Sequence, residues 1–216
     1  MRYFVSGEDG CLARAFIKEI EFDHVLLNDK LPKGWWNKAA NRDPEVDVLD
    51  GSVLTRLQAY RPDVIVHAAA LVNTDKCDAD PASAYRCNVE TTYNLAMVAK
   101  AVGAYFVYFS TTAIYDPSID TNHAPLTEES TVRPFTLYGR TQWQGELIAR
   151  GAIEPEKLLV VRPSFVYGGP RDNSSTLAKI IRDALGERRG IVATLDPKKW
   201  KTFTNIYDFT FILSQL

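Results

Sequence analysis

The chain has 216 residues, 46% of them hydrophobic and 24% charged, which is ordinary for a globular domain with a sizeable core. Its formal net charge of -2 gives no general electrostatic reason to bind nucleic acid or an anionic membrane, and its apolar runs are far shorter than a membrane span. The three cysteines and three histidines are scattered, without the spacing of a disulfide framework or a metal site. We therefore expect no bound metal. The first residues predict a strand and not a signal peptide, so we expect a cytoplasmic protein.

Strand-like and helix-like segments alternate along the chain, without an internal repeat or a clear linker. Near-continuous apolar strands that alternate with helices indicate a parallel sheet covered on both faces, the doubly wound α/β arrangement. The ligand site of such a fold lies beyond the carboxyl ends of its strands, so ligand contacts are expected among the residues that follow each strand. The expected strands are 2–6, 24–28, 62–70, 104–111 and 157–164, and the expected helices are 10–20, 52–60, 81–103 and the segment around Tyr138.

The turn after the first expected strand, SGEDGCLA, has the spacing of a dinucleotide-binding turn. Gly7, Gly10 and Ala13 form a GxxGxxA pattern that opens a helix. Glycine lets the backbone turn tightly and approach a pyrophosphate, while the N-terminus of the helix adds N–H donors and partial positive charge. We therefore predict cofactor contacts at Gly7 and Gly10 and at the first helical residues, Cys11 and Leu12.

Acidic residues farther along suit the adenosine half of a dinucleotide. Asp29 lies about 20 residues beyond the glycine turn, where an acid binds the adenosine ribose of NAD. Lys30 and Lys33 stand close by and would instead hold the 2′-phosphate of NADP, so the sequence leaves the two cofactors open. Asp47 and Val48 are predicted to flank the adenine. The alternative for each of these positions is an ordinary polar turn.

Small and hydroxylated residues follow two later strands. Ala68, Ala69 and Ala70 come after DVIVH, where small side chains let a dinucleotide lie on the backbone; the alternative is close packing in the core. Ser110 and Thr111 follow the next strand, where a hydroxyl could meet a substrate or the nicotinamide; the alternative is a turn or a helix cap.

Six segments follow one another in an order and at separations that are typical of one protein family: VSGEDGCLA, RPDVIVHAAALVNTDKCDADPASAYRCNVETTYNLA, VYFSTTAIYD, PLTEES, YGRTQWQGE and VVRPSFVYG. The chain resembles the extended short-chain dehydrogenase/reductase family, and within it the dTDP-4-dehydrorhamnose reductase branch, with the NAD-dependent epimerases and dehydratases close by. The resemblance implies a Rossmann domain over residues 1–165 that binds NAD or NADP. It also implies a small lobe over residues 166–216, interleaved with the sheet, that binds a nucleotide sugar.

The resemblance assigns roles to individual residues. The catalytic hydroxyl falls on Thr111 or Ser110, and the catalytic tyrosine falls on Tyr138, which exchanges a proton with the sugar while the nicotinamide moves a hydride. Besides the turns described above, the resemblance gives further cofactor contacts at Asn88, Ser110, Tyr138, Gln142, Arg162 and Pro163.

The chain departs from the family pattern at Gln142, one helical turn after Tyr138, where relatives carry a lysine whose charge lowers the pKa of the tyrosine. Glutamine can still hydrogen-bond a ribose hydroxyl and act in the active site, but it brings no charge. A second departure is the end of the sequence, where relatives continue, so we expect either a minimal substrate lobe or a shortened form of the chain.

These departures leave two functions open. The first is an NAD(P)-dependent reductase or epimerase that acts on a nucleotide-activated sugar. The second is a non-catalytic regulatory or scaffold subunit of the same fold, as in the regulatory subunit of methionine adenosyltransferase. The resemblance also implies a homodimer through the tyrosine-bearing helix, where Gly145 and Ala149 are small enough for close helix approach.

Overall fold

A computed structural model describes residues 2–7, 10–20, 51–116, 126–168 and 203–214 of the chain. Its central element is a four-stranded parallel sheet in the order β1-β2-β3-β4. The strands are β1 (Tyr3–Ser6), β2 (Val64–His67), β3 (Tyr105–Phe109) and β4 (Leu158–Val161). The strand expected at 24–28 lies outside the described residues.

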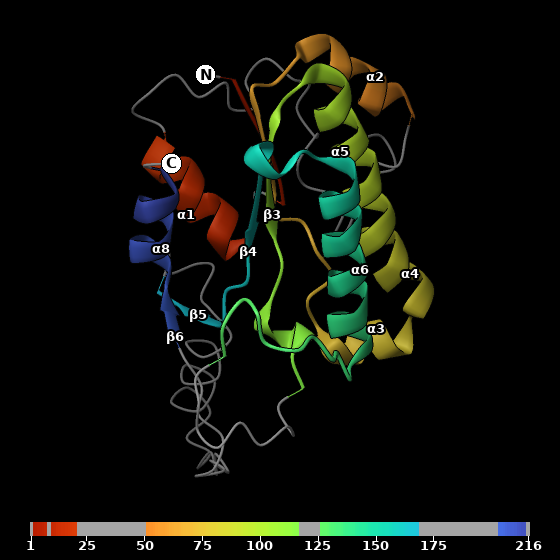
Figure 1. Ribbon diagram of the computed structural model, residues 1–216, viewed down its shortest axis with the longest axis vertical. Helices are drawn as coiled ribbons and strands as arrows, with labels where there is room; N and C mark the ends of the chain where they lie inside the picture. The colour runs from red at the N-terminus through yellow and green to blue at the C-terminus, as the bar shows by residue number, and fades with distance from the viewer. Residues whose placement is uncertain (1, 8–9, 21–50, 117–125, 169–202, 215–216) are drawn as a thin grey trace, which may run out of the picture.

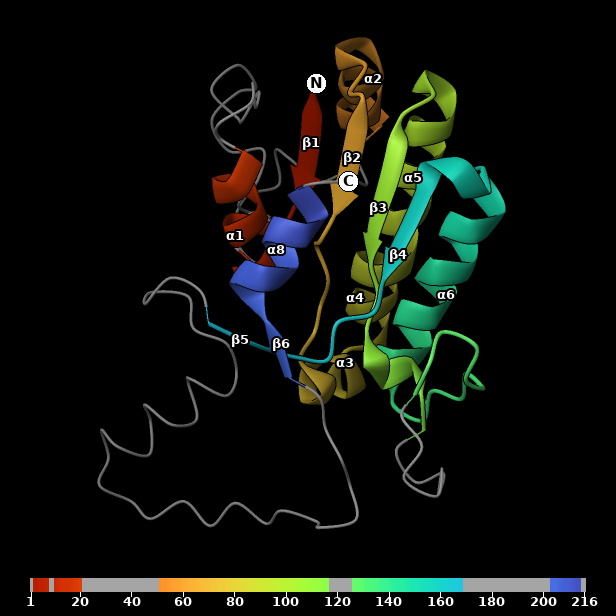
Figure 2. The same cartoon turned by 60° about the vertical axis from the view of Figure 1, so that its left-hand side comes forward.

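Helices cover both faces of this sheet (Figures 1 and 2). On one face lie α1 (Cys11–Ile20) and α8 (Ile206–Ser214), which pack against each other. On the other face lie α5 (Thr91–Val102) and α6 (Leu137–Ala152), and α2 (Gly51–Tyr60) packs against α5. A parallel sheet with helices on both faces is the doubly wound arrangement, so this prediction is confirmed. A sheet buried on both sides needs apolar strands, and the sequence provides them.

The long helix expected at 81–103 is present but interrupted. It begins as α4 (Pro81–Tyr85), which follows α3 (Thr74–Ala79) and is capped by the Asp80 carboxylate. A π-helical turn (Arg86–Glu90) joins it to α5, which ends at Gly103 in the left-handed region with φ 76°. A π-helical turn inserts an extra residue into a helix and often occurs at a functional site.

The described part of residues 166–216 packs onto the Rossmann sheet. The short strands β5 (Phe165–Tyr167) and β6 (Phe203–Asn205) form a separate two-stranded parallel sheet. Helix α8 follows β6 directly, and its Phe209 ring lies 5.6 Å from the Phe109 ring at the end of β3. Within the described segments, no helix is both long and apolar enough to cross a membrane.

Candidate active site

The glycine turn after β1 touches the end of β2. Gly7 has φ 75°, and a Cβ built on it would lie only 2.6 Å from the backbone N and Cα of Ala69 and 2.8 Å from the carbonyl carbon of Ala68. Any side chain here would collide with a backbone that cannot move aside. Gly7 therefore lets the exits of β1 and β2 approach each other closely, and the three predicted alanines lie at this edge of the sheet.

The N-terminus of α1 stands directly beyond this turn. The Gly10 amide donates to the Gly7 carbonyl at 2.8 Å, and the Arg14 amide makes a helical hydrogen bond to the Gly10 carbonyl at 3.0 Å. Cys11 and Leu12 belong to the first turn, whose N–H groups have no acceptor inside the helix. These donors, together with the helix dipole, suit a diphosphate. The Cys11 thiol itself points to the Gly168 carbonyl, 3.7 Å away, and burial raises its pKa.

A buried chain of hydrogen bonds runs from β1 to the π-helical turn. The Thr92 hydroxyl donates to the Asn88 carbonyl at 2.7 Å, so it accepts from His67 Nε2, 2.9 Å away. His67 Nδ1 then accepts from the Ser6 hydroxyl at 2.6 Å. The chain thus holds His67 as the neutral Nε2–H tautomer, and burial lowers its pKa to about 3.

The Asn88 side chain joins the residues after β2 to α6. Its Oδ1 accepts from the Leu71 amide at 2.7 Å, while its Nδ2 donates to the Leu71 carbonyl at 3.2 Å and to the Thr141 hydroxyl at 2.9 Å. Both N–H groups of the amide are therefore used within the protein. The structure thus gives Asn88 an architectural role, and direct contact with the cofactor stays a prediction.

Thr111 and Tyr138 come together at the carboxyl end of β3. Thr111 caps the short 3-10 turn Thr112–Ile114, and its Oγ1 accepts from the Ala113 amide at 3.1 Å. The hydroxyl also lies near the Tyr138 phenol. Burial raises the pKa of Tyr138, and the hydrogen bond from Thr111 offsets this in part. The two residues expected to carry out catalysis are thus neighbours at this end of the sheet.

Gly139, which the sequence did not single out, makes this approach possible. The Thr136 side chain accepts from the Gly139 amide at 3.1 Å and so caps α6. A Cβ on Gly139 would collide with the Ala113 carbonyl oxygen and lie 3.2 Å from Pro134 Cβ. The first turn of α6, which carries Tyr138, can rest against the turn after Thr111 only because position 139 has no side chain.

Gln142 lies one turn after Tyr138, and its side chain is buried. The Tyr108 hydroxyl on β3 donates to its Oε1 and to its main-chain carbonyl, each at 3.1 Å. The sequence pattern shows the missing lysine but gives no sign of Tyr108 as the partner of the glutamine.

Arg162 is held by a carboxylate that the sequence analysis missed. Glu146 is fully buried on α6, and its two oxygens accept from Arg162 Nε at 3.0 Å and from Nη2 at 2.5 Å. The other terminal nitrogen donates to the Tyr115 hydroxyl at 2.5 Å and to the Glu128 carbonyl at 3.2 Å. Arg162 therefore connects α6 to the residues after β3 and β4, and its predicted cofactor contact stays untested.

The remaining predicted positions are distributed as follows. The Pro163 carbonyl accepts from the Thr112 amide at 3.2 Å, and the Ser110 amide donates to the Val161 carbonyl at 2.8 Å, so both residues tie the ends of β3 and β4 together. Asp29, Asp47 and Val48 lie outside the described residues.

One reason given for a homodimer is wrong. Ala149 is fully buried in the core, and a Cβ on Gly145 would collide with the Tyr108 hydroxyl and lie 2.8 Å from the Asn88 carbonyl oxygen. These small residues therefore serve packing inside the chain.

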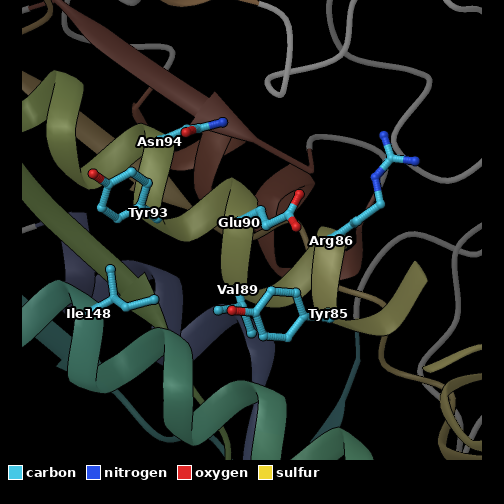
Figure 3. A pocket seen from close by; sticks show the side chains of 7 residues that line it. All are labelled: Tyr85, Arg86, Val89, Glu90, Tyr93, Asn94 and Ile148. Carbon is cyan, nitrogen blue, oxygen red and sulfur yellow. The ribbon is translucent and has the colours of Figure 1, made fainter. Parts of the chain in front are cut away.

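The outward face of the π-helical turn and α5 carries a pocket of about 420 Å³ (Figure 3). Its lining consists of Tyr85, Arg86, Val89, Glu90, Tyr93, Asn94 and Ile148.

Comparison with known proteins identifies the family. The model of the RmlD substrate binding domain matches residues 1–196. Methionine adenosyltransferase 2 subunit beta of Xenopus laevis is 30% identical over 219 residues, covering 100% of this chain and 61% of the relative. The dTDP-4-dehydrorhamnose reductase of Streptomyces griseus is 33% identical over 184 residues, covering 84% of this chain and 54% of the relative. The chain thus spans about half to three fifths of the length of these curated relatives.

Solved structures share the fold. A dTDP-4-dehydrorhamnose reductase of Clostridium acetobutylicum superimposes with a TM-score of 0.78 at 24% identity, covering 100% of this chain and 69% of that one. The enzyme WbmG of Bordetella bronchiseptica, in complex with NAD, superimposes with a TM-score of 0.74 at 25% identity, covering 99% of this chain and 67% of that one. With its parallel sheet, its glycine turn and the family model matched over most of its length, the chain belongs to the RmlD substrate binding domain family.

Proposed function

We propose that the chain is an NAD(P)-dependent reductase that acts on a nucleotide-activated sugar. The observation that carries this proposal is the pairing of Thr111 with Tyr138 at the same edge of the sheet as the Gly7 turn. A dinucleotide site and a proton donor at one sheet edge are the two parts that carbonyl reduction needs.

The residues after β1 and β2 fit a dinucleotide. Gly7 leaves no room for a side chain against Ala69, and the first turn of α1 offers the amides of Cys11 and Leu12 to the diphosphate. Similar folds were crystallised with NADP, in the reductase of Bacillus anthracis, and with NAD, in WbmG. A bound reduced nicotinamide would supply the hydride. The choice between NAD and NADP depends on Asp29 and the two lysines that follow it.

Tyr138 is suited to give a proton to the substrate oxygen. Because burial raises its pKa, the phenol keeps its proton at neutral pH. The Thr111 hydroxyl, whose oxygen already accepts from Ala113, donates to the Tyr138 oxygen and stabilises the phenolate that remains after transfer. A neutral Gln142 fits this direction, since an acid needs no cation to hold it deprotonated, whereas oxidation or epimerisation would need a tyrosinate base.

Relatives suggest the class of substrate. The similar structure MoeE5 was solved with UDP-glucose and with UDP-glucuronic acid, and WbmG with UDP. We therefore propose a nucleotide sugar as the substrate of this chain, held in part by residues 166–216, as the sequence predicts.

Two measurements test the proposal. Calorimetry with the oxidised and reduced forms of NAD and NADP should show binding of at least one dinucleotide. The protein, mixed with reduced cofactor and a panel of dTDP- and UDP-4-keto sugars, should then consume the reduced cofactor, as followed by its absorbance. Binding without turnover of any sugar in the panel would argue against a reductase.

A regulatory subunit is the second candidate. Two observations favour it: the similarity to methionine adenosyltransferase 2 subunit beta, and an uncharged Gln142 fixed by Tyr108. In this case the protein binds a dinucleotide without turnover and forms a complex with a methionine adenosyltransferase catalytic subunit. Size-exclusion chromatography of the mixture distinguishes this candidate from the first.

A homodimer is proposed through the outward face of the π-helical turn and α5. Tyr85 and Tyr93 (Figure 3) are 46% and 52% exposed there. Leu147 on α6 is 49% exposed. Sedimentation equilibrium should give a dimer for the wild type and a monomer for Tyr93→Glu.

A further inference from the structure

Tyr108 carries a buried phenol that has no role in the reaction proposed above. It lies on β3 and is 2% exposed. A buried hydroxyl needs a hydrogen-bond partner, and here both acceptors, the main-chain carbonyl and the side-chain Oε1, belong to Gln142. This contact crosses from the central sheet to the helix that carries Tyr138.

Gly145 on α6, which has no side chain, leaves space on the helix surface for this hydroxyl. A Cβ on Gly145 would collide with the Tyr108 oxygen and lie 3.1 Å from Tyr108 Cζ. The hydroxyl therefore occupies the place that a side chain at position 145 would take. A hydroxyl enclosed in this way has one orientation, and so does the group to which it donates.

The contact fixes which end of the Gln142 amide faces the sheet. A carboxamide has one oxygen that accepts and one NH2 group that donates. Burial raises the pKa of Tyr108, so the phenol keeps its proton and acts as a donor to the amide oxygen. The NH2 group is then the end of the amide that remains available to a ligand, on the helix face that Gln142 shares with Tyr138.

We propose that Tyr108 is a positioning residue that holds the Gln142 amide with its NH2 group available as a hydrogen-bond donor to the nicotinamide ribose. Gln142 then supplies the donor that a lysine supplies in relatives, without the charge. This inference rests on the proposed dinucleotide site, and it adds Tyr108 to that site.

Dinucleotide affinity tests the inference, because it does not depend on turnover. Calorimetry is carried out with NADH and NADPH on the wild type, Tyr108→Phe, Gln142→Met and the double variant. Tyr105→Phe is the matched control, since it removes the same hydroxyl from the exposed start of the same strand. We expect each single variant to weaken binding by about five- to tenfold, and the double variant by no more than one of them, because both remove the same oriented donor. Tyr105→Phe should bind as the wild type does.

The outcomes separate this inference from the proposed function. If the wild type binds a dinucleotide and Tyr108→Phe binds it equally well, or if the losses of the two single variants add, the positioning role is overturned while the site stands. If the wild type binds neither dinucleotide, the proposed site fails and this role fails with it. Should Tyr108→Phe not fold, Gln142→Glu decides the question. It retains an oxygen for Tyr108 but has no NH2 group, so we expect at least the same loss, and unchanged affinity would overturn the inference.

Discussion

The Glu146 carboxylate and the Arg162 guanidinium form a bidentate ion pair that connects α6 to the residues after β4. Glu146 is fully buried, and Arg162 is 12% exposed. Burial alone would raise the pKa of the Glu146 carboxyl, but hydrogen bonds from Arg162 and Arg150 bring it below its ordinary value. Tyr115 and Trp143 enclose the cation, with ring centroids 5.5 Å and 6.0 Å from the Arg162 guanidinium carbon.

Glu146→Ala should lower the free energy of unfolding by about 3–5 kcal/mol, because it leaves a largely buried guanidinium without its counter-charge. Urea denaturation followed by circular dichroism measures this loss. The control is Glu156→Ala, at an exposed position, which should change stability by less than about 0.5 kcal/mol. Equal stability of the two variants would show that the ion pair contributes little.

Gly139→Ala should destabilise the chain, because the added methyl group meets the Ala113 carbonyl and Pro134. The expected loss is about 1–3 kcal/mol, typical of overpacking against a backbone that cannot yield. Gly151→Ala on the same helix is the matched control, since nothing lies within 4 Å of a Cβ there. It should stabilise the chain by about 0.5–1 kcal/mol through helix propensity and reduced unfolded-state entropy. Opposite signs for the two variants in urea denaturation would confirm the close approach at Gly139, and a stabilised Gly139→Ala would refute it.

The alternation of apolar strands with helices was enough to predict the doubly wound sheet. Proline at position 81 and glycine at position 103 also marked the ends of one helical segment correctly. The strand expected at 62–70 was too long, because the chain leaves the sheet after His67 and the following alanines lie at the site. The π-helical turn was not predicted; Asn88, which lies within it, hydrogen-bonds to Leu71 and Thr141, residues far from it in sequence.

Within the site, the sequence located single residues but not their partners. The motif around Tyr138 pointed to the correct helix, yet its approach to Thr111 depends on the absence of a side chain at position 139. Glu146 and Arg162 are 16 residues apart, and Tyr108 and Gln142 are 34 apart. Such pairings follow from how α6 packs on the sheet, which no local pattern encodes.

His67 should make stability depend on pH. Its pKa is about 3 in the folded protein and about 6.5 when unfolded, so between these values the unfolded chain binds more protons. The contribution is fully present above about pH 6.5 and is lost as the pH falls, at a limiting slope of about 1.4 kcal/mol per pH unit. Urea denaturation of the wild type and of His67→Gln, from about pH 7 down to about pH 4, should show a smaller pH dependence for the variant. Parallel curves would mean that His67 is not buried in its neutral form.

Tyr138→Phe should slow reduction greatly while changing dinucleotide affinity little. The hydroxyl is the only part removed, so the ring still packs against its surroundings, but the proton for the substrate oxygen is gone. We expect kcat to fall by about 10²–10⁴-fold, the usual contribution of a positioned general acid, with the dinucleotide Kd within about twofold of the wild type. Thr111→Val should cause a smaller loss of kcat, because it removes the hydrogen bond that stabilises the phenolate and raises the pKa of Tyr138 further.

Since Tyr138 acts as an acid and burial raises its pKa, the wild-type reduction rate should stay level through neutral pH and decline only in strongly alkaline solution. A rate that rises with pH across the neutral range would show that Tyr138 acts as a base, and would favour oxidation or epimerisation over reduction.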